Sequence, residues 1–332
     1  MTILVTGGAG YIGSHTVLEL IKLGYDVITF DNLQKGYEKA VLGGKFIKGD
    51  LLNIDDLVNV FSKYKIDSVI HFAADSLVGE SMQKPDKYFT NNLIGSINLL
   101  NIMVKYNVKR IIFSSTAAVY GEPDKIPIEE DNLTIPTNTY GESKLAFEKI
   151  LRWYDIAYGI KYISLRYFNA AGADKSGKIG ECHNPETHLI PIILLTVLGK
   201  LNTDDNCVKI YGDDYNTPDG TCIRDYIHVT DLSIAHILAL KKLEEKNSVS
   251  KIYNLGNGKG FSVKEIIKVA EQVTGKKIKT KVIQRRAGDP AILIASSDKI
   301  KRELNWNPQF NDIHTIIESA WNWHKKHPDG YK

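Results

Sequence analysis

The chain has 332 residues, enough for about two domains of ~150 residues each, with 43% hydrophobic and 24% charged residues. These ordinary values exclude extensive disorder, collagen-like repeats and coiled coil as the main structure. The formal net charge is only +3, and the basic residues occur at most in short runs such as Lys276-Lys277 and Arg285-Arg286. A nucleic-acid-binding protein usually carries a clustered basic face, so we expect no nucleic-acid partner.

The cysteine content and the length of the apolar segments indicate the cellular compartment of the protein. The three cysteines are Cys182, Cys207 and Cys222. They form no C-x-x-C pattern, so we expect neither a disulfide framework nor a Cys-rich zinc site, and no metal. No signal peptide is visible, and the longest apolar stretch, 189–198, falls short of the ~20 residues of a membrane span. We therefore expect a cytoplasmic protein with no membrane contact.

Strand-like and helix-like segments alternate along the first half of the chain. Strands are predicted at 2–6, 26–30, 45–48, 67–72, 109–115 and 162–166. Helices are predicted after the first glycine cluster up to Gly24, and at 54–64, 86–107 and 140–158. This alternation is typical of an α/β fold, a doubly wound parallel sheet with helices on both faces. We assign it to residues 1–170.

The second half has a looser rhythm. Helices are predicted at 186–200, 231–245, 262–274 and 312–326, with strands at 208–211 and 252–255. We interpret residues 171–332 as a smaller C-terminal α/β domain that binds the substrate. We expect the chain to cross between the two domains more than once.

A glycine-rich loop follows the first predicted strand. The string Gly7-Gly-Ala-Gly-Tyr-Ile-Gly13 contains G-x-G-x-x-G, and Asp31 ends the next strand. Between a strand and a helix, such a loop brings backbone close to a pyrophosphate at the helix N-terminus, as in a Rossmann domain. A carboxylate at Asp31 binds ribose hydroxyls and repels a 2′-phosphate. The sequence therefore predicts NAD as cofactor.

Tyr140 and Lys144 are spaced to lie on one face of a helix. An ammonium close to a phenol lowers the tyrosine pKa from ~10 towards neutrality. Such a tyrosine can take a proton from a sugar hydroxyl while a hydride leaves the carbon. Ser114-Ser115-Thr116 ends a predicted strand, and Thr116 can hydrogen-bond the same hydroxyl. We predict that Tyr140, Lys144 and Thr116 are catalytic.

These motifs together resemble the extended short-chain dehydrogenase/reductase family, and within it the UDP-glucose 4-epimerase branch. Further strings carry the resemblance over essentially the whole chain. They are His71-Phe-Ala-Ala74, Arg166-Tyr-Phe-Asn169, Arg224-Asp-Tyr-Ile-His228, Tyr253-Asn-Leu-Gly256 and Arg285-Arg-x-Gly-Asp289. The resemblance implies NAD-dependent interconversion of UDP-galactose and UDP-glucose. C4 is oxidised, the 4-keto sugar rotates, and hydride returns to the opposite face.

The resemblance also implies contacts for individual residues. The cofactor would meet Gly7, Gly10, Tyr11, Ile12, Gly13, Asp31, Asn32, Asp50, Leu51, Phe72, Ala73, Ala74, Asn91, Ser114, Tyr140, Lys144 and Tyr167. The UDP-sugar would meet Thr116, Tyr140, Asn169, His188, Leu189, Tyr211, Arg224, Arg286 and Asp289. The two arginines would clamp the phosphates, since guanidinium suits bidentate contact with phosphate.

Some positions depart from the family pattern. Many members have a lysine near the NAD phosphates where this chain has Ala74-Asp75-Ser76, so fewer charges or other residues must neutralise the pyrophosphate. His188 is equally well interpreted as a phosphate or sugar contact and as a helix-start histidine. Leu293 stands where a bulky tyrosine often limits the sugar pocket, so N-acetylated sugars are a possible alternative substrate.

Related activities and the oligomeric state follow the same comparison. The alternatives are 4-epimerisation of a UDP-N-acetylhexosamine or UDP-glucuronate, or another nucleotide-sugar dehydrogenase or dehydratase. A 4,6-dehydratase needs an Asp-Glu pair after the threonine, where this chain has Ala117 and Ala118. A homodimer is expected through helices 86–107 and 140–158. Their surplus apolar residues are Leu99, Ile102, Leu145, Phe147 and Ile150; the alternative is that these only face the sheet.

Overall fold

The computed structural model describes residues 1–201, 205–286 and 289–332. Seven parallel strands form its main sheet, in the order β10-β6-β5-β4-β1-β2-β3. They are β1 (Thr2–Thr6), β2 (Asp26–Asp31), β3 (Lys45–Lys48), β4 (Ser68–His71), β5 (Arg110–Ser114), β6 (Lys161–Tyr167) and β10 (Lys251–Leu255). The strand order reverses between β1 and β4, and ligands of doubly wound sheets bind at such a switch point. The predicted Rossmann sheet is thereby confirmed.

Helices cover both faces of this sheet. One face carries α1 (Tyr11–Lys22), α8 (Val229–Glu244) and α10 (Asp298–Leu304). The other carries α2 (Ile54–Lys63), α5 (Gly95–Lys105) and α6 (Thr139–Tyr158). Alternation along β1 shows why both faces are apolar: Ile3 and Val5 pack under α1 and α8, whereas Leu4 packs under α2, α5 and α6. Burial on both faces explains the continuous apolar runs of these strands.

The helix predicted over 86–107 is interrupted. The chain forms α4 (Pro85–Tyr88), a wide turn η2 (Phe89–Ile94) and then α5. Within η2, the buried Asn92 accepts a hydrogen bond from the backbone N–H of Asp75 at 2.8 Å and donates to the Ser143 hydroxyl at 3.1 Å. Such π-type turns are frequent at functional sites, and this one ties the segment after β4 to α6.

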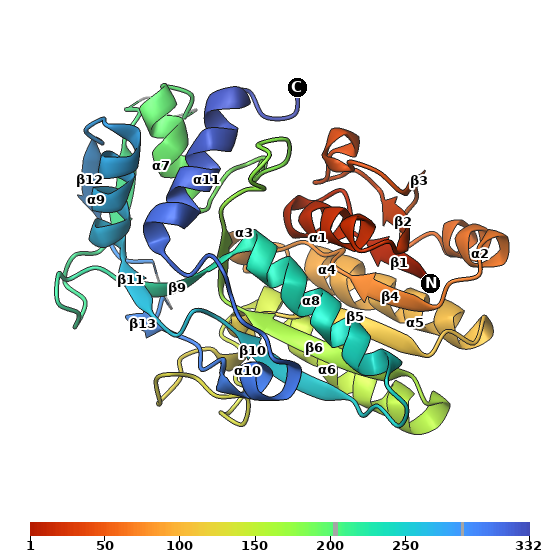
Figure 1. The fold of residues 1–332 in the computed structure, drawn as a ribbon. Helices are drawn as coiled ribbons and strands as arrows, with labels where there is room; N and C mark the ends of the chain where they lie inside the picture. Colours follow the sequence, from red (N-terminus) through yellow and green to blue (C-terminus); the bar gives the residue numbers. More distant parts are fainter. Residues whose placement is uncertain (202–204, 287–288) are drawn as a thin grey trace.

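A smaller unit lies beside the carboxyl edge of the main sheet. Its helices α7 (Leu189–Leu198), α9 (Val263–Thr274) and α11 (Ile313–Lys326) pack on one another (Figure 1). Its strands are β7 (Asn169–Ala171), β8 (Val208–Tyr211), β9 (Ile223–His228), β11 (Gly260–Ser262), β12 (Thr280–Ile283) and β13 (Ile292–Leu293). Strand β9 pairs with β7, β11 and β13, and β8 pairs with β12.

Three elements beyond residue 170 belong to the main sheet and its covering helices: α8, β10 and, later in the chain, α10. β10 pairs with β6, and α8 packs against α1. The chain therefore leaves the main sheet after β6, returns for α8 and β10, and leaves again for α9 (Figure 1). Short helices fill the connections: η1 (Glu38–Ala40), α3 (Val78–Ser81) and η3 (Ala117–Tyr120). Within the described ranges, no helix combines the length and apolarity needed to cross a membrane.

Candidate active site

A cavity of about 450 Å³ lies at the switch point of the main sheet. The segments that follow β1, β2, β4, β5 and β6 line it from one side, and residues of β9 and the loop before β13 line it from the other. Carboxyl ends of parallel strands meet at one edge, so residues far apart in the sequence converge there. Most of the predicted site residues line this single cavity.

The glycine loop forms the floor of the cavity beside α1. Gly7 has φ +71°, and a Cβ there would lie 2.5 Å from the Ala73 nitrogen. A Cβ on Gly13 would lie 2.2 Å from the Gly7 oxygen, so the helix packs against the loop only without a side chain. Gly10 caps α1 with no side-chain hydrogen bond, which leaves N–H groups of the first turn for an anion. These residues fit a dinucleotide pyrophosphate.

Asp31 lies at the end of β2 and lines the cavity. Its carboxylate accepts hydrogen bonds from the backbone N–H groups of Ala9, at 3.0 Å, and Leu33, at 2.8 Å. Burial raises the pKa of Asp31, and these two N–H groups act in the opposite direction. Further along the same wall, the Asn32 amide donates to Asp50 at 3.1 Å. The carboxylate is thus held in place in the cavity wall, where it could accept hydrogen bonds from the ribose of a bound dinucleotide.

The glycine loop, Asp31, Tyr140 and Lys144 line one part of the cavity, which we call the cofactor wall. Tyr140 and Lys144 lie close to Thr116 there. Tyr140 and Lys144 lie on the first turns of α6, whose N-terminus is capped by the Asn138 side chain. The Lys144 ammonium donates to the Ser114 carbonyl at 2.8 Å and lies 6.0 Å from the centre of the Tyr140 ring. All three catalytic candidates line the cavity. The expected shared helix face and the expected proximity of Thr116 are both present in the geometry.

The protonation states of this pair differ from the expectation for the chain alone. Burial raises the pKa of Tyr140, while a hydrogen bond with Thr116 acts to lower it. Burial also lowers the pKa of Lys144 to about 7, against the opposing effect of Glu148. Desolvation therefore outweighs the attraction between ammonium and phenolate that the sequence argument relied on. A lowered Tyr140 pKa then requires a further positive charge close to the phenol.

A buried ion pair supports the catalytic residues from below. Arg166 donates to both carboxylate oxygens of Glu148, at 2.5 and 3.0 Å, and to the Tyr120 hydroxyl at 2.9 Å. The Ser115 hydroxyl donates to Glu148 at 2.6 Å. The Arg166 motif and the serine pair of the sequence thus connect β5, β6 and α6 under the site. Bidentate geometry and these extra hydrogen bonds compensate the desolvation of the two charges.

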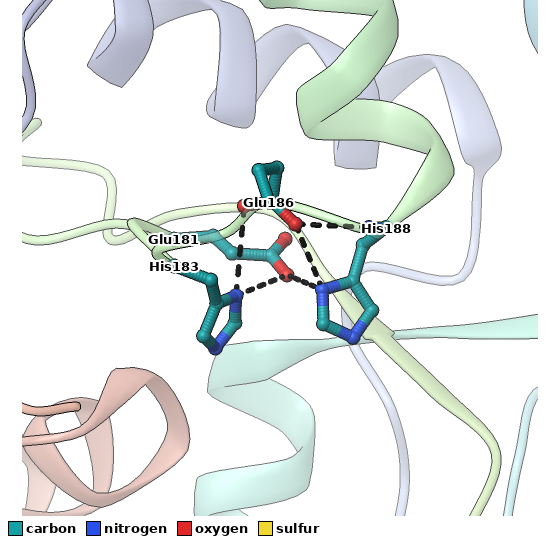
Figure 2. Close-up of side chains that lie close together, drawn as sticks. All are labelled: Glu181, His183, Glu186 and His188. Carbon is teal, nitrogen blue, oxygen red and sulfur yellow. Dashed lines mark hydrogen bonds and ion pairs between the residues drawn. The ribbon is translucent and has the colours of Figure 1, made fainter. Parts of the chain in front are cut away.

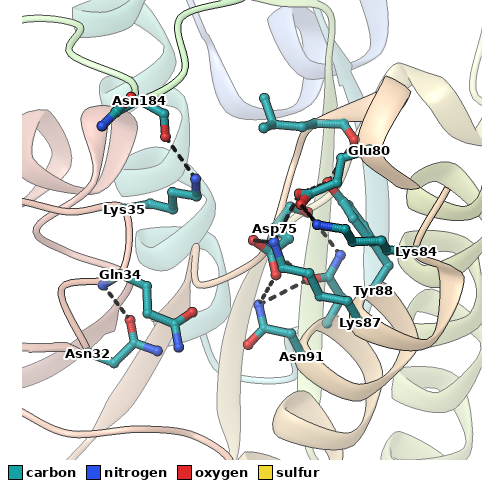
Figure 3. A network of polar contacts seen from close by, with 12 residues as sticks. Asn32, Gln34, Lys35, Asp75, Glu80, Lys84, Lys87, Tyr88, Asn91 and Asn184 are labelled. Atoms are coloured by element: carbon teal, nitrogen blue, oxygen red, sulfur yellow. Dashed lines mark hydrogen bonds and ion pairs between the residues drawn. The ribbon is translucent and has the colours of Figure 1, made fainter. Parts of the chain in front are cut away.

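A lysine outside the cavity lining lies close to the segment that lacks the expected lysine. Asp75 is buried and accepts from the Asn91 amide at 3.1 Å, and it lies 3.4 Å from the Lys87 ammonium. On the side of the glycine loop, Lys35 lines the cavity and donates to the Asn184 carbonyl at 2.8 Å (Figure 3). The sequence analysis missed Lys35. Its place in the loop directly after the acidic end of β2 could have indicated it.

The substrate candidates divide into two groups. Asn169, Arg224, Asp289, His188 and Leu293 line the cavity. Arg224 forms an ion pair with Asp289, and its second guanidinium nitrogen donates to the Ile223 carbonyl at 2.8 Å. The arginine expected to hold phosphate is thus paired with Asp289, another residue expected to contact the UDP-sugar.

Four other candidates lie outside the cavity. The Ser114 hydroxyl forms a hydrogen bond with the Tyr167 hydroxyl at 2.6 Å, and Tyr167 lines the cavity. Leu189 packs among the helices of the smaller unit. The Arg286 guanidinium lies over the Tyr211 ring at 3.8 Å, beside a second hollow that Asp289 also lines. Ala287 and Gly288 of the Arg285–Asp289 string lie outside the described residues.

A cluster of glutamate and histidine side chains lies where the loop before α7 meets the cavity. Its members are Glu181, His183, Glu186 and His188 (Figure 2). Burial acts to lower the pKa of both imidazoles, but the two glutamates outweigh it and raise the pKa of His183 to about 9 and that of His188 to about 10. His188 is also the residue before the first turn of α7. It is therefore a helix-start residue that also lines the cavity.

Comparison with known proteins agrees with this architecture. The sequence matches the NAD dependent epimerase/dehydratase family over residues 3–256. The UDP-glucose 4-epimerase of Halalkalibacterium halodurans is 57% identical over 331 residues, covering 100% of this chain and 98% of that protein. A crystal structure of a UDP-glucose 4-epimerase has a TM-score of 0.96 and 54% identity, and the one from Bifidobacterium longum in complex with NAD+ and UDP has 0.94 and 42%; both comparisons cover 100% of each chain. The chain belongs to the NAD dependent epimerase/dehydratase family.

Proposed function

We propose that this protein is an NAD-dependent 4-epimerase that interconverts UDP-galactose and UDP-glucose. One observation carries the proposal: the glycine loop, the Tyr140–Lys144 pair and the Arg224–Asp289 pair all line one cavity. A redox centre and an anchor for a nucleotide diphosphate are thus within reach of one ligand. The full-length similarity to UDP-glucose 4-epimerases supports the same substrate.

Each residue has a separate task in this mechanism. Bound NAD supplies a hydride acceptor and donor for C4 of the hexose. Tyr140 removes the proton of the 4-hydroxyl as the ketone forms and returns it after the sugar has turned. Lys144 and Thr116 hold Tyr140 and the hydroxyl in position. Arg224 and Asp289 hold the nucleotide, so the sugar can rotate while UDP stays anchored.

The alternatives differ in the walls around the sugar. Ala117 and Ala118 line the cavity directly after Thr116, and neither alanine can transfer a proton, which disfavours a dehydratase. Leu293 also lines the cavity. This side chain leaves more room than a tyrosine, so 4-epimerisation of a UDP-N-acetylhexosamine is the second candidate function, with UDP-glucuronate as a further substrate to test.

The test is proton NMR of UDP-galactose with the purified protein and no added NAD. Growth of UDP-glucose anomeric signals to a steady ratio is expected, because the reaction has no net redox change and needs no second substrate. If conversion starts only after NAD is added, the activity stands and the cofactor is held weakly. Absence of conversion with NAD present contradicts the proposal and moves attention to UDP-N-acetylhexosamines and UDP-glucuronate.

We further propose that two copies associate through α5 and α6. Leu99, Ile102 and Phe147 pack against the sheet and Leu145 packs against η3, so these expected contact residues serve the chain's own core, and Ile150 is only partly exposed. The outward face of α6 instead exposes Trp153 by 65% and Ile156 by 64%, and Ile94, the last residue of η2 before α5, is exposed by 49%. Exposed apolar side chains on neighbouring helices suit a two-fold four-helix interface.

Analytical ultracentrifugation tests this association. Trp153→Glu is expected to shift the protein from dimer to monomer, since it places a charge in the interface. The control is Leu133→Glu, at an equally exposed apolar residue of the loop after η3. A monomeric parent, or a Trp153→Glu variant that remains dimeric, contradicts the dimer.

We also propose a cytoplasmic location for this protein, which is supported by three cysteines that are all free.

A further inference from the structure

The Glu181–His188 segment gathers four potential metal ligands that the proposed epimerase mechanism does not use. One ligand atom from each of Glu181, His183, Glu186 and His188 can be chosen so that all four lie within 4.8 Å of one another. Figure 2 shows both imidazole rings turning one nitrogen towards the two carboxylates. The sequence analysis expected no metal because it considered cysteine patterns; this cluster is built from histidine and glutamate in the spacing E-x-H-x-x-E-x-H.

The distances within the cluster are also those expected between neighbouring donors of a tetrahedral ion. The Nδ1 atom of His188 lies 3.1 Å from Glu181 and 3.0 Å from Glu186. The Nδ1 atom of His183 lies 3.3 and 3.5 Å from the same two carboxylates. Donors around a tetrahedral Zn²⁺ with bonds of 2.0–2.2 Å lie about 3.3 Å apart. The three separations that involve Glu181 Oε1 or Glu186 Oε1 are 3.0–3.3 Å, close to that edge length, and His183 lies 3.5 Å from the other Glu186 oxygen, Oε2.

His183 provides an independent indication. Its Nδ1 atom is buried and forms no well-aligned hydrogen bond among the described residues, although it lies 3.3 and 3.5 Å from the two carboxylates. Buried polar atoms are nearly always satisfied, and an exception calls for an explanation such as an ion. The two carboxylates beside it are also buried, with side chains exposed by 4% for Glu181 and 8% for Glu186. A divalent cation would satisfy the nitrogen and balance both negative charges.

We propose that Glu181, His183, Glu186 and His188 bind one Zn²⁺ ion in a structural site. Imidazole and carboxylate ligands suit divalent transition metals, and four protein ligands leave no open position for chemistry. The ion would fix the loop between β7 and α7. That loop also reaches the cofactor wall: Tyr11 donates to the Gly172 carbonyl at 2.7 Å, and Lys35 donates to the Asn184 carbonyl at 2.8 Å. Metal binding would therefore stabilise the wall of the NAD cavity.

The test measures metal binding directly on chelator-treated full-length protein. Equilibration with Zn²⁺ followed by elemental analysis is expected to give about one equivalent per chain, and Zn²⁺ is expected to raise the thermal midpoint. Titration with Co²⁺ is expected to give the intense visible absorption of tetrahedral coordination. Two variants remove one ligand each, His183→Gln and Glu186→Gln. In the parent, Glu186 accepts hydrogen bonds from the backbone N–H groups of Thr187 and His188. Glu186→Gln retains a side-chain oxygen that can accept them.

Both variants are expected to weaken Zn²⁺ binding at least tenfold, since even outer-sphere changes weaken metal sites about 10- to 100-fold. The matched control is His314→Gln, at an exposed histidine of α11, which should bind Zn²⁺ like the parent. Substoichiometric binding by the parent, or equal binding by His183→Gln and the control, overturns the proposal. So does a His183→Gln variant whose thermal midpoint falls equally with and without Zn²⁺, because that result identifies the cluster as an ion-pair network only. None of these readouts depends on epimerase activity.

Discussion

The cofactor wall of the cavity and the part lined by Arg224 and Asp289, which we call the nucleotide wall, differ in how far their side chains are already positioned for a ligand. Asp31, Tyr140 and Lys144 come from a strand end or the first turns of a helix and are buried; Asp31 accepts from the Ala9 N–H of the glycine loop, and Lys144 donates to the Ser114 carbonyl of β5. In the nucleotide wall, Arg224 is paired with Asp289, and Arg286 lies on Tyr211 outside the cavity. The cofactor therefore meets groups that are already positioned. A sugar nucleotide has to exchange one ion pair for its own contacts, so the two walls respond differently to substitution.

Tyr140→Phe produces the largest expected effect. Removal of the proton-transferring hydroxyl should lower turnover about 10²- to 10⁴-fold, with NAD still bound because the glycine loop is untouched. The measurement is UDP-galactose conversion by proton NMR, with the NAD content of the same sample as control. A variant with full turnover would remove Tyr140 from the mechanism.

Lys144→Met separates activity from stability on the same wall. Turnover should fall at least a hundredfold, while the cofactor-free protein should unfold at a higher temperature, because a desolvated amine is replaced by an apolar side chain. The folded pKa of Lys144 is about 7 and the unfolded value about 10.4. At pH values between these two pKa values, Lys144 is protonated in the unfolded chain but largely neutral in the folded protein. The free energy of unfolding of the parent therefore increases as the pH rises.

The stabilisation by Lys144→Met should therefore be larger at pH 6 than at pH 9. Thermal unfolding of the cofactor-free proteins at both pH values provides the measurement. The pH-independent control is Lys149→Met, at an exposed lysine of the same helix. Equal gains at the two pH values would contradict a lowered Lys144 pKa.

A pair of aspartate variants compares the two walls directly. Asp31→Ala should weaken NAD binding about 10- to 100-fold and leave UDP binding close to that of the parent, since hydrogen bonds of a charged group contribute about 1.5–3 kcal/mol. Asp289→Ala should show the opposite pattern. Calorimetric titration of both variants with both ligands checks this. Equal losses for NAD and UDP in either variant would mean that the walls do not act separately.

Leu293→Tyr gives the smallest expected effect and refines the nucleotide wall. A larger side chain lining the cavity should reduce conversion of UDP-N-acetylglucosamine about tenfold relative to UDP-galactose, by filling space that an N-acetyl group needs. The ratio of the two kcat/KM values is the readout. An unchanged ratio would place the limit of the sugar pocket elsewhere.

Local sequence signals identified candidate cofactor residues that line one cavity. The Gly7–Gly13 loop, Asp31 and the Tyr140–Lys144 pair each depend on a few neighbouring residues in one strand or helix. The wide turn at 89–94 was missed because its segment is apolar-periodic like an ordinary helix, and only the contacts of Asn92 with Asp75 and Ser143 accompany the interruption. The expected lowering of the Tyr140 pKa did not appear in the chain alone, because burial depends on the whole surrounding fold.

The alternation of strands and helices in the first half of the chain and the residue types of the candidate redox centre follow from the sequence itself, because backbone preferences and side-chain periodicity act over short distances. Only the tertiary structure decided the order of the strands in the main sheet, that β10 joins it beside β6, and that Arg224 pairs with Asp289. Those arrangements depend on the path of the chain in space and on the desolvation of buried charges, which no local pattern encodes.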